Sequence, residues 1–291
     1  MPTKIEKDSV TGTDTTGHEW DGVRELNTPL PTWWVYTFYA TIVWAIAYYI
    51  VYPAWPGLSG YTKGIWSYSQ RVEVEADIAQ ARAAQKGYRD RVGALSTDDI
   101  RKDPDLLAFA LAGGRAAFAD NCVPCHAVAG AGRIGYPSLA DDDWLWGGTL
   151  AEIQRTIEVG ARSGHAETRV SDMPRFGADG MLTGPQIDDL AEFVLQLSGR
   201  GDAAMAASAE RGRPLYAENC AACHGDSGEG KPDVGAPRLN DQIWLYGGDK
   251  QSIVASINAA RAGVMPAWAG RLDVETIKML TVYVHSLGGG R

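Results

Sequence analysis

The longest apolar stretch of the chain lies near its N-terminus. Residues 26–62 contain no Asp, Glu, Lys, Arg or His. The middle of this stretch is long enough for one helix across a hydrocarbon layer about 30 Å thick. Aromatic side chains gather at both of its ends, as they do at the two interfaces of a membrane, and prolines precede and follow it. The pattern predicts a transmembrane helix over residues 32–54.

Two other interpretations of this stretch are a buried helix of a soluble domain and a cleaved signal peptide. Ala45-Ile46-Ala47 resembles a cleavage site. However, more acidic than basic residues precede the apolar run, which is unlike the basic start of a signal peptide. We therefore expect an uncleaved anchor, preceded by an N-terminal segment (1–31) and followed by a charged, alanine-rich spacer (55–104) that contains a solvated helix.

The rest of the chain contains an internal repeat. The segment from Arg115 to His126 resembles the segment from Arg213 to His224, and further short motifs follow each copy in the same order. The repeat predicts two tandem, mainly helical domains with long loops (105–199 and 200–291), joined by a Gly-, Ala- and Ser-rich linker at 199–209. Each copy closes with apolar residues at helical spacing, which are Ile187, Leu190, Val194 and Leu197 in the first and Ile277, Leu280, Val284 and Leu287 in the second.

Each repeat carries Cys-x-x-Cys-His, the attachment signature of c-type haem. Two thiols three positions apart on a helical turn can add to the two vinyl groups of one porphyrin, and the adjacent imidazole then faces the iron. A redox dithiol or half of a structural zinc site would also use Cys-x-x-Cys, but neither explains a histidine after both copies. The residues concerned are Cys122, Cys125 and His126 in the first repeat and Cys220, Cys223 and His224 in the second.

Methionine is the predicted sixth ligand of each iron. Met173 and Met265 are each followed by proline, which would stiffen the loop that presents the sulfur. We expect each methionine to serve the histidine of its own repeat, Met173 with His126 and Met265 with His224. Ligation by histidine and methionine raises the haem potential and suits electron transfer rather than oxygen binding.

The other histidines and methionines lack a partner in the repeat. Among the histidines without a counterpart, His165 is the alternative distal ligand. Met279 falls within a helical pattern, so we expect it to pack in the core.

A family resemblance appears in the segment before the apolar stretch. Residues 17–31 read Gly-His-Glu-Trp-Asp-Gly-Val-Arg-Glu-Leu-Asn-Thr-Pro-Leu-Pro and are followed by Trp33-Trp34. This leader resembles that of the dihaem subunit of cbb3-type cytochrome c oxidases (the CcoP/FixP family), and each repeat is similar to a class I cytochrome c domain. The resemblance covers nearly the whole chain. It implies an all-α fold with one N-terminal transmembrane helix and two tandem class I cytochrome c domains; some members of the family carry two spans, and this sequence shows one.

The resemblance to class I cytochromes c also implies roles for residues around each haem. Pro137 and Pro237 would offer backbone carbonyls to the imidazole N–H groups of His126 and His224, which fixes each ring and its basicity. The residues expected to press on the haem faces are Leu139 and Leu239. Haem packing, contact with the haem propionates and a surface role all remain open for Trp144, Trp244, Arg162 and Arg261.

The family implies an electron-transfer function. The chain would accept electrons from a periplasmic cytochrome c and pass them through two covalently bound haem c groups to a monohaem subunit. From there the electrons would reach the haem–copper subunit, which reduces oxygen to water; the chain itself shows no candidate oxygen-reducing site, so it would not be an enzyme alone. Because haem c is attached on the periplasmic side, both haem domains would lie in the periplasm of a bacterium. Residues 1–31 would then lie in the cytoplasm, with the anchor among the lipids of the inner membrane.

Two other functions fit part of the pattern. A free-standing anchored dihaem cytochrome would connect a bc1-type complex to several terminal enzymes. A dihaem peroxidase would need one iron with an open or displaceable position, and the repeated Met-Pro motif speaks against it.

Charge and composition argue against several other classes of protein. A net charge of -9 argues against nucleic-acid binding and favours a basic donor, although it would equally serve solubility. Hydrophobic residues make up 45% of the chain and charged residues 22%, which excludes a disordered chain and a multi-span membrane protein.

Overall fold

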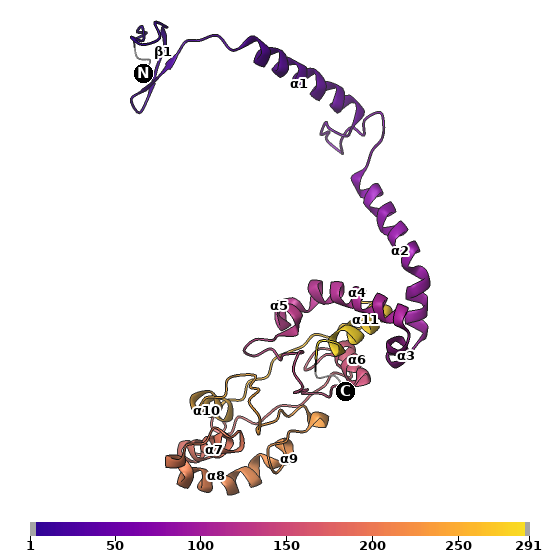
Figure 1. Cartoon of the computed structure of the whole chain (residues 1–291), viewed down its shortest axis with the longest axis vertical. Helices are drawn as coiled ribbons and strands as arrows, with labels where there is room; N and C mark the ends of the chain where they lie inside the picture. Colours follow the sequence, from indigo (N-terminus) through magenta and orange to yellow (C-terminus); the bar gives the residue numbers. More distant parts are fainter. Residues whose placement is uncertain (1–3, 289–291) are drawn as a thin grey trace. The chain divides into compact units, whose positions relative to one another are not determined.

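The computed structural model of the chain describes residues 4–288 and forms two compact units, one up to Ala83 and one from Ala84 (Figure 1). The N-terminal unit begins with an antiparallel hairpin of β1 (Thr15–Trp20) and β2 (Val23–Leu26). Its turn, Asp21-Gly22, has positive φ angles of 46° and 85°, as two-residue hairpin turns require. The hairpin is not among the elements expected above, although an Asp-Gly pair between two short segments is a hairpin signal.

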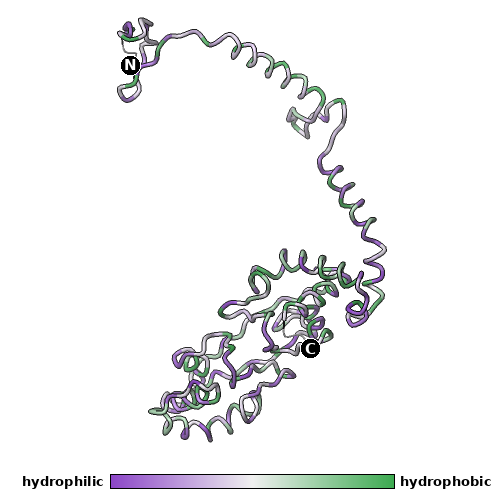
Figure 2. Tube along the Cα trace, in the orientation of Figure 1, coloured by the Kyte–Doolittle hydropathy of each residue, from purple (hydrophilic) through white to green (hydrophobic). Residues whose placement is uncertain are grey.

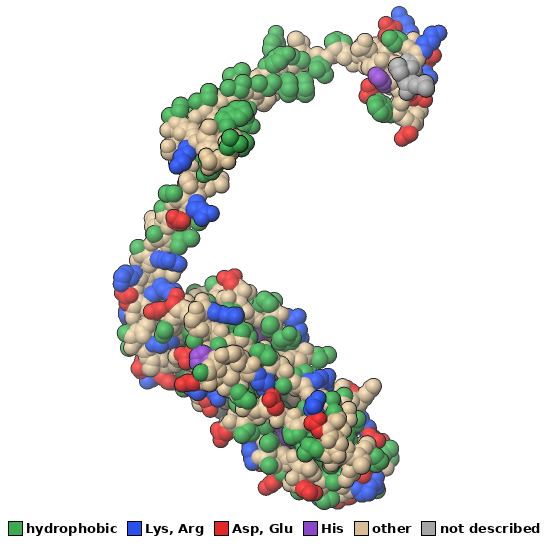
Figure 3. Space-filling view, turned by 180° about the vertical axis from the view of Figure 1, so that it is seen from behind, with side chains coloured by type: hydrophobic (Ala, Val, Ile, Leu, Met, Phe, Trp, Pro, Cys, Tyr) green, Lys and Arg blue, Asp and Glu red, His purple; other side chains and the backbone are tan. Residues whose placement is uncertain are grey.

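Helix α1 (Thr32–Val51) is the predicted apolar helix. Its 20 residues rise by about 30 Å at the α-helical pitch, and none of them is buried. Tyr52 N–H donates to Tyr48 O at 2.8 Å, and the helix ends there, slightly before the expected residue 54. Hydrophobic side chains cover the surface of α1 in Figure 3, and Figure 2 shows its second half as an apolar run. An apolar surface of this length suits contact with lipid rather than with water.

Helix α2 (Gln70–Ala94) is the charged, alanine-rich helix of the expected spacer. Its first part is exposed, as expected for a solvated helix. Its last turn differs, because Val92 is fully buried together with Ile100 of α3 (Thr97–Lys102). The end of the segment expected as a spacer (55–104) is therefore part of the core of the C-terminal unit.

The C-terminal unit is helical, and its helices repeat in order. The first set is α4 (Pro104–Asn121), α5 (Val123–His126), α6 (Leu150–Val159) and α7 (Gly184–Leu197). The second set is α8 (Ala206–Asn219), α9 (Ala221–His224), α10 (Lys250–Asn258) and α11 (Val274–His285). Short 3-10 helices are η1 (Val128–Gly130), η2 (Ala203–Met205) and η3 (Pro232–Val234). Helix α8 begins inside the stretch expected as a linker (199–209).

The helices of the two sets pack crosswise. Helix α4 packs on α11, and α8 packs on α7 (Figure 1). Helix α6 adds to the first of these pairs and α10 to the second. The first core is therefore built from α4, α6 and α11, and the second core from α7, α8 and α10. The two repeats exchange their last helices, so neither core is the self-contained domain that the repeat predicts.

A glycine lets each pair of helices cross closely. A Cβ atom on Gly114 of α4 would lie 2.6 Å from Tyr283 Cβ on α11, and one on Gly212 of α8 would lie 3.0 Å from Phe193 Cβ on α7. Only a residue without a side chain fits at such a crossing. Two aromatic pairs occupy equivalent positions beside the crossings, Phe118–Tyr283 and Phe193–Tyr216, with ring centroids 5.4 and 5.2 Å apart.

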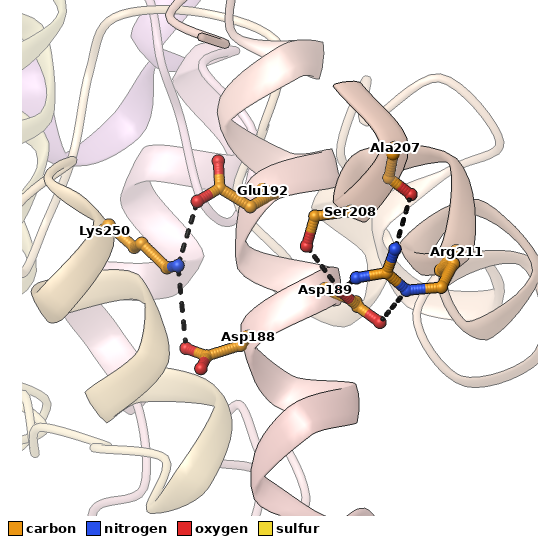
Figure 4. Close-up of polar contacts among 7 residues, drawn as sticks. All are labelled: Asp188, Asp189, Glu192, Ala207, Ser208, Arg211 and Lys250. Carbon is orange, nitrogen blue, oxygen red and sulfur yellow. Dashed lines mark hydrogen bonds and ion pairs between the residues drawn. The ribbon is translucent and has the colours of Figure 1, made fainter. Parts of the chain in front are cut away.

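Polar contacts also fasten α7 to its partners from the second repeat (Figure 4). Glu192 is 5% exposed, and its Oε1 lies 2.9 Å from Nζ of Lys250 on α10. On α8, Arg211 Nη2 donates to Asp189 Oδ1 at 2.6 Å, and Ser208 donates to the same carboxylate. The hydrogen bond from Arg211 holds the pKa of Asp189 below its usual value. Because a buried carboxylate needs a partner, these pairs stabilise the exchanged packing.

Candidate functional site

The two cysteine motifs each occupy one helical turn. Cys122 caps the end of α4 and the start of α5, and its carbonyl accepts hydrogen bonds from the N–H of Cys125 at 3.1 Å and of His126 at 2.9 Å. The second motif repeats this geometry, with the same two distances from the Cys220 carbonyl. Such a turn holds both thiols and the imidazole of each motif at fixed positions.

Each motif histidine is oriented by a proline carbonyl, as the cytochrome c resemblance implies. His126 Nδ1 lies 2.9 Å from Pro137 O, and His224 Nδ1 lies 2.8 Å from Pro237 O. A carbonyl can only accept, so Nδ1 carries the proton and Nε2 keeps a free lone pair. Burial lowers the pKa of both histidines and outweighs the opposite effect of the carbonyls. Each ring is therefore a neutral ligand with Nε2 free to bind a metal.

His126 opens into a cavity of about 460 Å³, a size typical of cofactor sites. Cys122, Cys125 and Met265 line the same cavity, whose other walls are mostly apolar and aromatic side chains. His165 lies elsewhere, in a loop where its Nδ1 accepts from Glu167 N–H at 3.1 Å. The cavity thus combines two thiols and an imidazole with a thioether from the other repeat.

The second motif and the other methionine contact the same buried cluster. Met173 packs against the buried cluster that contains Ala221 and Tyr216, as do Cys220 and Leu239. This arrangement differs from the expected pairing of each methionine with the histidine of its own repeat, because Met265 and not Met173 lines the cavity of His126.

Backbone hydrogen bonds explain the crossed arrangement at the first motif. Ala161, just after α6, exchanges two hydrogen bonds with Met265, at 3.0 and 2.9 Å. Trp268 N–H donates to Ile157 O at 3.1 Å and extends the contact. These bonds fix the Met265 loop to the end of α6, which belongs to the first repeat.

An equivalent bond serves the second motif. Ala178 N–H, in the loop after Met173, donates to Asn258 O at the end of α10, at 2.9 Å. Each methionine loop is thus attached to the repeat that holds the opposite histidine.

Burial keeps the first thiol of each motif protonated. Burial, and to a lesser extent the neighbouring cysteine of each motif, raises the pKa of Cys122 and of Cys220 to about 11. Cys122 and Cys220 are therefore protonated at neutral pH, which disfavours binding of a metal by these two residues as thiolates.

Polar groups near the two sites fit the propionates of a haem. Arg162 and Arg261 both line the His126 cavity. Arg162 is held by the carbonyls of Gly263 and Ser171, at 2.6 and 3.0 Å. Beside the second motif, the indole N–H of Trp244 is buried and lacks a hydrogen-bond acceptor among the residues described. A propionate oxygen would supply that acceptor.

Comparisons with known proteins identify the family of the chain. Residues 12–59 match the family model of the N-terminal domain of cytochrome oxidase-cbb3, FixP, and residues 109–194 and 207–284 match that of cytochrome c oxidase, cbb3-type, subunit III. The chain belongs to the FixP/CcoP family. Curated members include subunit FixP of Bradyrhizobium diazoefficiens, 54% identical over 100% of both chains, and subunit CcoP of Azospirillum sp. (strain B510), 53% identical over 98% of both. Subunit CcoP of Cereibacter sphaeroides is 49% identical over 95% of both chains. The family expected from the leader and the repeats is thereby confirmed.

Two further residues of this FixP/CcoP chain join the site without having been expected there. Trp146 and Tyr246 line the His126 cavity, one from each repeat. They occupy equivalent places in Trp-Leu-Trp-Gly-Gly and Trp-Leu-Tyr-Gly-Gly, so the repeat itself contained a signal for them. Met279, by contrast, is 3% exposed in the first core, and its predicted packing role is confirmed.

Proposed function

We propose that the chain carries two covalent haem c groups with crossed axial ligands. One is attached to Cys122 and Cys125, and the other to Cys220 and Cys223. The iron of the first takes His126 and Met265 as its axial ligands, and the iron of the second takes His224 and Met173. The observation that carries this proposal is the cavity in which His126, its proton fixed on Nδ1 by Pro137 O, shares one space with Met265.

The function that follows is electron transfer within a cbb3-type cytochrome c oxidase. Each iron, when bound, changes between the ferrous and ferric states and supplies the one-electron chemistry. The histidines and methionines would hold the two irons, and the apolar walls would exclude water. Arg162 and Arg261 would balance the charge of propionates at the first site, and the Trp244 indole N–H would donate a hydrogen bond to a propionate at the second. Closed coordination of this kind favours an electron carrier over a peroxidase.

Membership of the FixP/CcoP family supports a particular path for the electrons. The chain accepts electrons from a periplasmic cytochrome c and delivers them to the monohaem and haem–copper subunits of the oxidase. Helix α1 anchors it in the bacterial inner membrane, with residues 1–31 in the cytoplasm and the C-terminal unit in the periplasm. Copurification with a haem–copper subunit is expected; isolation as a lone cytochrome that serves another enzyme would favour the free-standing carrier instead.

The ligand assignment has a direct test. The double variant Cys122→Ser/Cys125→Ser should carry one haem by intact mass and by pyridine haemochrome assay. In this background, Met173→Leu should abolish the methionine-to-iron charge-transfer band of the ferric protein, whereas Met265→Leu should leave the band in place. The opposite result would restore the pairing within each repeat, and an intact mass of the unsubstituted chain without two added haems would overturn the proposal.

A further inference from the structure

The two repeats touch where Trp146 packs on Gly235. Gly235 has a φ of +64°, and a Cβ atom there would lie 2.6 Å from both Cε2 and Cη2 of the Trp146 ring. The ring therefore lies flush against the backbone of the other repeat. Gly235 begins the short loop that ends at Pro237, whose carbonyl accepts the hydrogen bond from His224.

Trp146 is itself held in a fixed place. It lines the cavity of His126 and Met265, and the guanidinium of Arg169 lies 5.4 Å from its ring centroid, within the range of a cation–π contact. Trp146 thus belongs to the first haem site, while its benzene ring contacts a loop of the second.

The equivalent loop of the first repeat contacts the second repeat less tightly. Gly135 begins the loop that ends at Pro137, and its N–H donates to Leu245 O at 2.8 Å. The nearest atom to a Cβ on Gly135 would be Tyr246 Cε1, at 3.4 Å, an ordinary van der Waals distance. Only the Trp146–Gly235 side combines a tight ring contact with a left-handed backbone.

We propose that Trp146 is a positioning residue for the haem site of His224, acting across the boundary between the repeats. By fixing Gly235, the indole keeps Pro237 O in place to accept from His224 Nδ1. That hydrogen bond raises the basicity of the imidazole, and a more basic ligand stabilises ferric iron. This inference rests on the haem assignment proposed above.

The direction of the effect follows from the hydrogen bond. In Trp146→Leu the loop loses its support, the bond to His224 weakens and the ferric state is less stabilised. At a fixed solution potential, the ratio of reduced to oxidised haem at His224 should rise on the order of threefold or more. Trp146→Tyr, which introduces the residue found at position 246, keeps an aromatic ring and should restore most of the wild-type ratio.

The experiment is a redox titration of the purified full-length chain in detergent. The two ferric low-spin EPR signals are first assigned to their haems with Met173→Leu and Met265→Leu. The matched control is Trp144→Leu, because Trp144 lines the same cavity and packs with the first core. It should alter only the His126 haem, whereas Trp146→Leu should move the His224 haem.

A second variant tests the same contact from the opposite side. Gly235→Ala should push the loop away from Trp146 and also shift the His224 haem. Its control is Gly199→Ala, which has a similar φ of +72° but open space around it, and which should shift neither haem. If Trp146→Leu fails to fold, the comparison of Gly235→Ala with Gly199→Ala still tests whether the contact between Trp146 and Gly235 affects the His224 haem.

The failures of the two proposals are distinguishable. If both haems show histidine and methionine ligation but Trp146→Leu and Gly235→Ala leave the His224 haem unchanged, Trp146 is not a positioning residue. If the unsubstituted chain lacks one of the two haem signals, the haem assignment itself is wrong.

Discussion

Ala161 and Met265 exchange a pair of backbone hydrogen bonds, with N···O distances of 3.0 and 2.9 Å, although they belong to different repeats. This short antiparallel contact joins the end of α6 to the loop that presents the methionine. Together with the crossed packing of α4 on α11 and of α8 on α7, it makes the C-terminal unit one interlocked body rather than two domains in series. The consequences below can be measured.

The interlocked fold predicts that a chain cut between the repeats stays together. Residues 199–201 are exposed, so a protease site can be placed there. After cleavage, the fragments should still elute as one species, because each would lose a whole packed helix face by separating. Size-exclusion chromatography before and after the cut checks this. Two separate haem-containing fragments in native buffer would contradict the exchange.

Gly212 should tolerate no side chain. In Gly212→Ala the new methyl group would meet Asp189 O and lie 3.0 Å from Phe193 Cβ, so α7 and α8 must move apart. Overpacking of this kind costs about 1–3 kcal/mol of unfolding free energy, measurable by chemical denaturation. The control is Gly87→Ala in α2, where a Cβ meets nothing within 4 Å and the better helix propensity of alanine should stabilise by up to about 1 kcal/mol. Equal destabilisation by both variants would refute the close crossing.

Removal of the Lys250 charge should leave Glu192 buried without its ion partner (Figure 4). We expect Lys250→Met to lower the unfolding free energy by about 1–2 kcal/mol, a moderate value because the lysine side chain is 43% exposed and solvent screens the pair. Glu192→Gln in the same chain should recover part of the loss. Lys102→Met, which breaks the exposed pair with Asp99, should change stability by less than about 0.5 kcal/mol. The same loss in both single variants would show that the burial of Glu192 is irrelevant.

Asp143 should make stability depend on pH. Burial, and then the charges of Asp241 and Asp141, raise its pKa from 3.8 to about 6, with Arg238 opposing them. The folded state then holds the proton more tightly than the unfolded chain, so the unfolding free energy falls as pH rises between these two values and is level above them. Because the group is partly solvated, we expect a fall of about 1–2 kcal/mol.

The variant Asp143→Asn isolates this effect. It should remove the fall and be more stable than the unsubstituted chain at pH 7 by about 1 kcal/mol. Denaturation at several pH values between 4 and 7 measures both, with the exposed neighbour variant Asp142→Asn as the control. A pH profile unchanged by Asp143→Asn would assign the dependence to another group.

Structural features that depend only on residues close together in the sequence could be predicted from the sequence. The anchor follows from an unbroken apolar run, and the structure has it as α1. The start of α4 is likewise local, because the Asp103 carboxylate accepts from the N–H groups of Asp105 and Leu106 and Pro104 occupies the first turn. The apolar spacing of Ile187 and Leu190 predicts the buried face of α7. Each of these depends on a few consecutive turns of chain.

Other features required contacts between distant residues. Nothing near Val92 distinguishes the last turn of α2 from the solvated turns before it; its burial comes from α3 and the rest of the first core. Likewise, the support of Gly235 by Trp146 joins loops of different repeats, and no local pattern specifies such a contact.

The sequence by itself determined the apolar N-terminal helix, the two Cys-x-x-Cys-His motifs, the candidate methionines and the helical class. Only the tertiary structure decided which methionine faces which histidine. The reason is physical, because the two repeats have nearly equivalent amphipathic helices and equivalent glycines at the helix crossings. Hydrophobic periodicity therefore predicts which faces of α7 and α11 are buried, but it does not predict which helix packs on each face. The partner is chosen by distant contacts, such as Ala161 with Met265 and Ala178 with Asn258, which form only when the whole C-terminal unit packs.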